Sequence, residues 1–232
     1  MWNETPRALV FDLDDTLYLE RDFAESGFKA AGDWLRSETG VDGLHAICTR
    51  LFAQGNRANI FDDALRELAP QKPHALVERL VDVYRHHLPE IALADDAKRC
   101  LERHIGRISL GLITDGLAET QWAKIRSLNI EPFFDCIVCT GDWGRKYWKP
   151  HPRSYEFMEQ RFMAEGRDMI YVADNPAKDF VTAKARGWRT VQLARPGRIH
   201  TMSAAEQSHN AHETIKSLDD FEAFKSITVR DH

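Results

Sequence analysis

Closely spaced acidic residues follow the first apolar run of the chain. Residues 8–11 lead directly into DLDDT, which contains Asp12, Asp14 and Thr16 in the pattern DxDxT. Two carboxylates that close repel unless a proton or a cation lies between them. Magnesium prefers hard oxygen ligands and bridges carboxylate to phosphate, and a carboxylate can attack phosphorus. The spacing indicates metal-assisted phosphoryl transfer, although an acidic helix start explains an isolated DxDxT equally well.

Polar residues also follow two later apolar runs. Thr114 and Asp115 come after the run 109–113, where a hydroxyl and backbone N–H groups can hold phosphate oxygens at a helix start. A simple helix cap is the plainer explanation of Thr114 alone. Asp174 follows the run 169–173, and Asp179 lies five residues later. Four carboxylates at neighbouring strand ends are hard to explain without a bound metal.

A lysine sits at the end of a basic and aromatic segment. Lys149, in GRKYWKPHP, is followed by Pro150 and by Pro152, which stiffen the backbone and fix the direction of the side chain. A fixed ammonium can neutralise charge on phosphate and on an attacking aspartate. A solvated basic loop is the default alternative for this segment.

Alternating strands and helices are expected to position these polar residues. We predict strands over 8–11, 109–113, 136–139, 169–173 and 190–193, and helices over 117–129, 152–163 and 176–186, the last ending at Gly187. This alternation is typical of an α/β fold with a Rossmann-like parallel sheet flanked by helices. Ligands bind such sheets outside the carboxyl ends of the strands, where the acidic residues fall.

A helical region interrupts this alternation. Residues 18–92 contain several amphipathic patterns and no convincing strand, for example Phe23, Phe28, Ala31 and Leu35 on one face. We therefore predict a small α-helical cap domain over 18–92, inserted into a Rossmann-like catalytic core formed by 1–17 and 93–232. A lid over the strand ends would follow.

The ordered set of motifs resembles the haloacid dehalogenase superfamily of phosphohydrolases, with a helical cap inserted after the first motif. The resemblance implies that Asp12 is the nucleophile and a metal ligand. It implies that Asp14 is the general acid and base and binds Mg²⁺ through its backbone carbonyl. Thr114 and Lys149 would bind phosphate, Asp174 would ligate the metal, and Asp179 would ligate it or order its waters. Ala173 departs from the glycine often found there.

The resemblance implies a magnesium-dependent phosphatase that acts on a small phosphorylated metabolite, a sugar phosphate or a nucleotide, through an aspartyl-phosphate intermediate. A carbon–halogen hydrolase needs neither a metal nor a proton donor at Asp14, so we do not favour it. A phosphomutase of the same family stays open as an alternative. So does a non-catalytic scaffold that binds phosphorylated ligands.

Composition restricts the partners. The net charge is −5, from 31 basic and 36 acidic residues, which disfavours an extended nucleic-acid interface. The chain opens without the basic start and apolar stretch of a secretory signal, and it has no apolar run of membrane-spanning length. We expect a cytoplasmic protein with no membrane or nucleic-acid partner.

Overall fold

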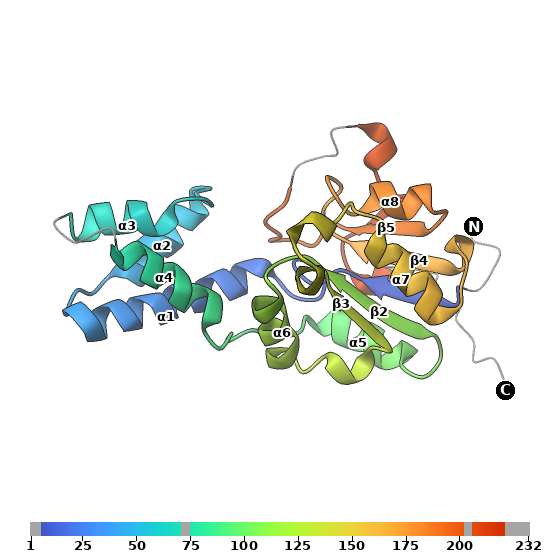
Figure 1. The fold of residues 1–232 in the computed structure, drawn as a ribbon, viewed down its shortest axis with the longest axis horizontal. Helices are drawn as coiled ribbons and strands as arrows, with labels where there is room; N and C mark the ends of the chain where they lie inside the picture. The colour runs from blue at the N-terminus through green and yellow to red at the C-terminus, as the bar shows by residue number, and fades with distance from the viewer. Residues whose placement is uncertain (1–5, 71–74, 202–205, 221–232) are drawn as a thin grey trace. The chain divides into compact units, whose positions relative to one another are not determined.

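The chain forms two compact units in the computed structural model, which describes residues 6–70, 75–201 and 206–220. The first unit comprises the residues up to Glu20 together with those from Ala92 onward, and the second comprises Arg21–Ile91. The second unit is thus an insertion that follows the first strand in the chain (Figure 1). Near the two ends of the insertion, the Ala94 N–H donates a hydrogen bond to the Leu17 carbonyl at 2.9 Å.

A six-stranded parallel sheet forms the centre of the first unit, in the order β3-β2-β1-β4-β5-β6. Its strands are β1 (Ala8–Phe11), β2 (Ser109–Thr114), β3 (Cys136–Cys139), β4 (Met169–Ala173), β5 (Arg189–Leu193) and β6 (Glu213–Ile215). The first five were predicted to within one residue at each end. The sheet confirms the predicted Rossmann-like α/β class.

The edge strand β6 was not predicted from the sequence. Its three residues pair with β5 in the register Val191 to Glu213 and Leu193 to Ile215. Only Ile215 is buried. An edge strand with a single buried side chain has no apolar run, which is the signal that revealed the other five strands.

The described residues of the first unit form four α-helices. They are α5 (Asp95–His104), α6 (Ala118–Ser127), α7 (Arg153–Phe162) and α8 (Phe180–Ala185), and short 3₁₀ turns lie at 131–133, 140–143, 145–147, 166–168, 207–209 and 218–220. Helices α6 and α7 are one or two residues shorter at each end than predicted. Helix α8 begins at Phe180 rather than residue 176 because a turn occupies the preceding residues. Gly187 lies beyond its end with φ of 80°, as a helix terminus of this kind requires.

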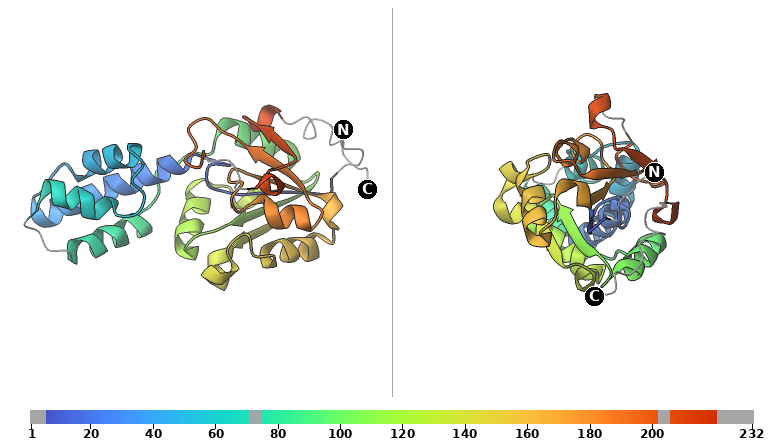
Figure 2. Two further views of the ribbon diagram at one scale, coloured as in Figure 1. Left: turned by 90° about the horizontal axis from the view of Figure 1, so that it is seen from above. Right: turned by 90° about the vertical axis from the view of Figure 1, so that its right-hand side faces the viewer.

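Helix α5 was not predicted, although its sequence carries the pattern of a buried helix face. Ala97, Cys100, Leu101 and His104 are buried at positions i, i+3, i+4 and i+7. Figure 2 shows α5 on one side of the sheet and α7 and α8 on the other. The sheet is therefore covered on both faces, as expected for parallel strands.

The central strand β1 lies between β2 and β4, and all four of its side chains are fully buried. An aromatic cluster packs beneath this part of the sheet. The Tyr155 ring lies 5.6 Å from the Tyr171 ring and 5.4 Å from the Trp188 ring, both in edge-to-face contact. Because Tyr171 is in β4, the cluster joins the sheet rigidly to the helices on that face.

In its described residues the second unit contains helices and no strand, with α1 (Glu20–Thr39), α2 (Leu44–Ala53), α3 (Ile60–Leu68) and α4 (Ala75–His86). Its core includes the predicted face of α1, with Phe28 stacked on Tyr84 at 5.5 Å. A methyl group at Gly27 would collide with the Tyr84 ring, so glycine permits this approach of α1 and α4. None of the helices described in either unit is both long and apolar enough to cross a bilayer. The role of this unit as a cap stays a prediction.

Leu9→Ala should strongly destabilise the protein because Leu9 is fully buried in β1. We expect the free energy of unfolding to fall by about 2–5 kcal/mol. Leu117→Ala removes the same atoms from a side chain that is 51% exposed, and should cost less than about 0.5 kcal/mol. Urea unfolding followed by circular dichroism measures both values. Equal losses would contradict the assignment of β1 to the core.

Candidate active site

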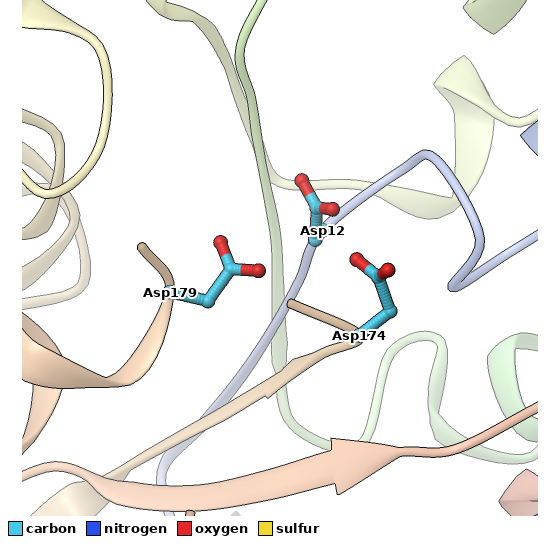
Figure 3. Close-up of side chains that lie close together, drawn as sticks. All are labelled: Asp12, Asp174 and Asp179. Atoms are coloured by element: carbon cyan, nitrogen blue, oxygen red, sulfur yellow. The ribbon is translucent and has the colours of Figure 1, made fainter. Parts of the chain in front are cut away.

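Three aspartates converge at the carboxyl edge of the sheet. Asp12 follows β1, Asp174 follows β4, and Asp179 lies directly before α8. Each contributes a carboxylate oxygen to a group whose members all lie within 4.8 Å of one another. Figure 3 shows the three side chains pointing toward a common centre. All three residues are at most 3% exposed, so water screens their mutual repulsion poorly.

Backbone hydrogen bonds position these aspartates. The Asp12 N–H donates to the Val172 carbonyl at 2.9 Å, which extends the pairing of β1 and β4 by one residue. The loop after β4 then turns back on itself. The Asn175 N–H donates to Asp179 Oδ2 at 3.1 Å, and the Asn175 carbonyl accepts from the Asp179 N–H at 3.1 Å. Asp179 is thereby held beside Asp174.

Lys149 places one ammonium between two of the carboxylates. Its Nζ lies 2.6 Å from Asp12 Oδ1 and 2.8 Å from Asp179 Oδ1, and it donates to the Tyr171 hydroxyl at 2.9 Å. The Lys149 side chain is fully buried. Burial alone would lower the pKa of Lys149, but the carboxylates of Asp12 and Asp179 raise it well above its usual value. Lys149 is therefore a permanent positive charge.

The charges of the cluster are unbalanced. Burial raises the pKa of Asp174 to about 9, and the carboxylates of Asp12 and Asp179 add to that effect. Burial likewise raises the pKa of Asp12 to about 6, because it outweighs the attraction of Lys149. Within the described part of the chain, the buried oxygen Asp174 Oδ2 has no hydrogen-bond partner. An unpartnered carboxylate oxygen among acidic neighbours fits a divalent cation with a preference for oxygen ligands.

Asp14 lies outside this group and has its own set of donors. Its Oδ1 accepts hydrogen bonds from the Tyr18 hydroxyl and, at 2.7 Å, from Lys124 Nζ, and its Oδ2 accepts from Gln121 Nε2 at 3.0 Å. Burial would raise the pKa of Asp14, but the Lys124 ammonium and these hydrogen bonds lower it below its usual value. The structure thus separates an aspartate held as a carboxylate from the crowded cluster of three.

Thr114 and Asp115 lie at the end of β2. The Thr114 hydroxyl accepts a hydrogen bond from Gln121 Nε2. The Asp115 carboxylate accepts from the Thr140 hydroxyl at 2.7 Å and from the Lys149 N–H at 3.1 Å. Asp115 therefore fixes the backbone of Lys149. That Thr114, Asp115 and Lys149 bind a phosphate stays a prediction.

Sequence reasoning missed several residues around the site. Gln121 and Lys124 lie three residues apart on α6, so a helical projection after Thr114 could have placed them together. Lys178 stands inside the motif DNPAKDF that was already singled out. Tyr171 and Tyr18 gave no signal, since an aromatic residue beside an acidic motif is usually a core residue.

The fold and part of the sequence match known proteins. A family model described as haloacid dehalogenase-like hydrolase matches residues 9–193. A glyceraldehyde 3-phosphate phosphatase of Methanocaldococcus jannaschii is 27% identical over 223 residues, which cover 92% of this chain and 96% of that protein. A phosphoserine phosphatase of Thermus thermophilus is 29% identical over 168 residues, covering 70% and 62% respectively.

A solved structure shares the architecture. The structure of a haloacid dehalogenase (HAD) family hydrolase from Deinococcus radiodurans, with bound phosphate and sodium, aligns with a TM-score of 0.65. The alignment covers 93% of both chains at 19% identity. At 19% sequence identity this similarity supports the fold alone, and it agrees with the parallel sheet described above.

The raised pKa of Asp174 predicts a pH-dependent stability of the metal-free protein. Folded Asp174 binds its proton more tightly than the unfolded chain does. Its contribution to the free energy of unfolding is therefore complete below its usual pKa of 3.8, and this stabilisation is lost as the pH rises toward about 9. With a chelator present, the melting temperature should fall between about pH 5 and about pH 9. Asp174→Asn should flatten that fall and raise the melting temperature at the alkaline end.

Asp95→Asn, at an exposed aspartate in the same unit, is the control and should keep the wild-type pH profile. Magnesium should raise the melting temperature of the wild type more than sodium chloride at matched ionic strength does. At a hundredfold excess over the dissociation constant, binding adds about 2.7 kcal/mol. An Asp174→Asn protein that responds to magnesium as strongly as the wild type would contradict a metal site at Asp174.

Proposed function

Because the chain belongs to the haloacid dehalogenase-like hydrolase family, we propose that it is a magnesium-dependent phosphatase of small phosphorylated metabolites. The observation that carries the proposal is the Asp12 carboxylate, held at 2.6 Å by the Lys149 ammonium beside Asp174 and Asp179. The relatives named glyceraldehyde 3-phosphate phosphatase and phosphoserine phosphatase support the same class of reaction on small phosphorylated substrates.

Magnesium fits the carboxylate cluster. Asp12 and Asp174 would hold the ion through carboxylate oxygens, and Asp14 would contribute its backbone carbonyl. Asp179 already pairs with Lys149 and with the Asn175 N–H, so ordering water around the ion suits it better than direct ligation. The bound ion supplies positive charge that lets an anionic phosphoryl group approach anionic aspartates.

Asp12 acts as the nucleophile. One oxygen of its carboxylate attacks phosphorus, and the bond from phosphorus to the leaving oxygen breaks while Asp14 gives that oxygen a proton. Water then attacks the phosphorus of the aspartyl phosphate and gives a proton to Asp14. Inorganic phosphate leaves and the Asp12 carboxylate is restored. Lys149 favours the ionised form of Asp12, which the attack requires.

The position of Asp14 suggests how it changes partners. Its carboxylate is held by Lys124, Gln121 and Tyr18. As a proton donor, Asp14 needs a raised pKa, so it has to exchange the Lys124 contact for the leaving oxygen. In the second step Asp14 acts as a base, and for this it must be ionised, the form that the Lys124 ammonium stabilises. Asp14 becomes a carboxylate when it gives its proton to the leaving oxygen, and we infer that Lys124 stabilises that carboxylate until water attacks.

The helical unit Arg21–Ile91 is the proposed cap that selects the substrate. Its insertion after β1 supports this role, since the chain leaves the core just beyond Asp12 and Asp14. A sugar phosphate or a nucleotide remains the proposed substrate class. A phosphomutase would move the phosphoryl group to a second hydroxyl of the substrate, and a binding scaffold would release none, so the products separate these alternatives.

Asp12→Asn should abolish turnover, because an amide cannot accept the phosphoryl group. The assay is hydrolysis of p-nitrophenyl phosphate with magnesium, and with a chelator as the metal-free arm. Asp95→Asn should keep the wild-type rate, and circular dichroism should show both variants folded. Acid-quenched wild type incubated with radiolabelled substrate should carry a label that hydroxylamine releases. Clear turnover by Asp12→Asn contradicts the assignment of the nucleophile.

Asp14→Asn should slow steady-state turnover by roughly 10²- to 10⁴-fold, the usual contribution of a general acid and base. Because p-nitrophenolate leaves without much protonation, the first step should survive better than the second. Rapid mixing should therefore show a burst of p-nitrophenolate, equal to the enzyme concentration, before slow turnover. A wild-type rate, or slow turnover in which no burst appears, counts against Asp14 as the base that activates water.

A further inference from the structure

All three N–H groups of the Lys149 ammonium face protein acceptors in this structure. An ammonium carries three donors, and Lys149 Nζ lies within 2.9 Å of three acceptors, Asp12 Oδ1, Asp179 Oδ1 and the Tyr171 hydroxyl. Its side chain is fully buried. The cation that steadies the Asp12 carboxylate is therefore engaged with protein groups, and a second cationic side chain would add to the positive charge that a phosphoryl group at Asp12 meets.

Lys178 is a second lysine beside the same cluster. It immediately precedes Asp179, and its backbone N–H donates to the Asn175 carbonyl at 3.3 Å within the turn that holds Asp179. Its Nζ lies 3.6 Å from Asp115 Oδ2, and its side chain is 33% exposed. Among the residues described, this ammonium donates no hydrogen bond shorter than that contact. Lys178 thus adjoins Asp179 in the chain, pairs with Asp115 and is still partly accessible.

The charge of Lys178 is felt at the proposed reaction centre. The Lys178 ammonium lowers the pKa of Asp12 and of Asp174, against the larger effect of burial. Because the Lys178 side chain is 33% exposed and its backbone belongs to the turn that holds Asp179, its ammonium is available to a phosphoryl group bound beside these carboxylates. Its neighbour Asp115 is already satisfied by the Thr140 hydroxyl and the Lys149 N–H.

We propose that Lys178 is a catalytic residue that binds the phosphoryl oxygens of the substrate and moves from Asp115 onto them. This inference rests on the proposed phosphatase function and adds the residue that receives the substrate's charge. Lys149 and Lys178 then divide two tasks between them. The buried lysine orients the nucleophile, and the accessible lysine holds the group under attack.

The test compares Lys178→Met, which removes the charge, with Lys178→Arg, which keeps it. Titration calorimetry with inorganic phosphate and magnesium should give a dissociation constant about 10- to 100-fold higher for Lys178→Met, as expected for the loss of one charged hydrogen bond. KM for p-nitrophenyl phosphate should rise by a similar factor. Lys178→Arg should recover most of the loss. Lys98→Met removes a lysine that is 61% exposed on α5 and should change neither value.

A purely structural role predicts a different pattern. If Lys178 only held Asp115, Lys178→Met and Asp115→Asn would lower the melting temperature alike, and phosphate binding to Lys178→Met would stay at the wild-type value. That result overturns the inference, as does a wild type that binds no phosphate. A wild type that binds phosphate but hydrolyses no ester refutes the phosphatase proposal, while a weakened Lys178→Met still supports the phosphate contact.

Discussion

The confinement of three buried carboxylates, two of which share one buried ammonium, is the constraint on which the rest of the structure depends. Asp12, Asp174 and Asp179 contribute three negative charges when ionised, and Lys149 contributes one positive charge. Among these four buried side chains two negative charges then remain, and the more exposed Lys178 offsets them only in part, so a divalent cation would suit the cluster. Without such an ion the cluster relieves its repulsion by holding a proton, as the raised pKa of Asp174 indicates.

The scaffold has to hold these like charges together, and it does so with elements that cannot easily relax. Asp12 is fixed by a backbone hydrogen bond to β4, and Lys149 is fixed at both ends, by Asp115 at its N–H and by Tyr171 at its Nζ. Tyr171 in turn packs edge-to-face against Tyr155 in the core. The packing of the sheet against its helices therefore fixes the positions of the charged side chains.

The sequence was informative where a local pattern determines the structure. Apolar runs located five strands, and parallel strands with polar residues at their carboxyl ends placed Asp12 and Asp174 on one edge. The pattern did not reveal β6, whose pairing depends on β5 rather than on its own residues. Nor did it reveal Lys124 or Tyr171, because contacts with Asp14 and Lys149 arise between elements distant in sequence. The hydrogen-bond and ion-pair partners of Lys149 and Lys178 could be assigned only from the positions of the side chains in the structure.

The hydrogen bond between the Ala94 N–H and the Leu17 carbonyl has a consequence for how this architecture can change. It holds the two ends of the insertion together inside the core unit, so the core already closes the loop that any inserted segment must span. The entropic cost of loop closure grows only slowly with the length of the insert. We therefore expect that inserted units of different size can be accommodated at this point while the sheet and the carboxylate cluster stay unchanged, so the proposed cap could vary independently of the site.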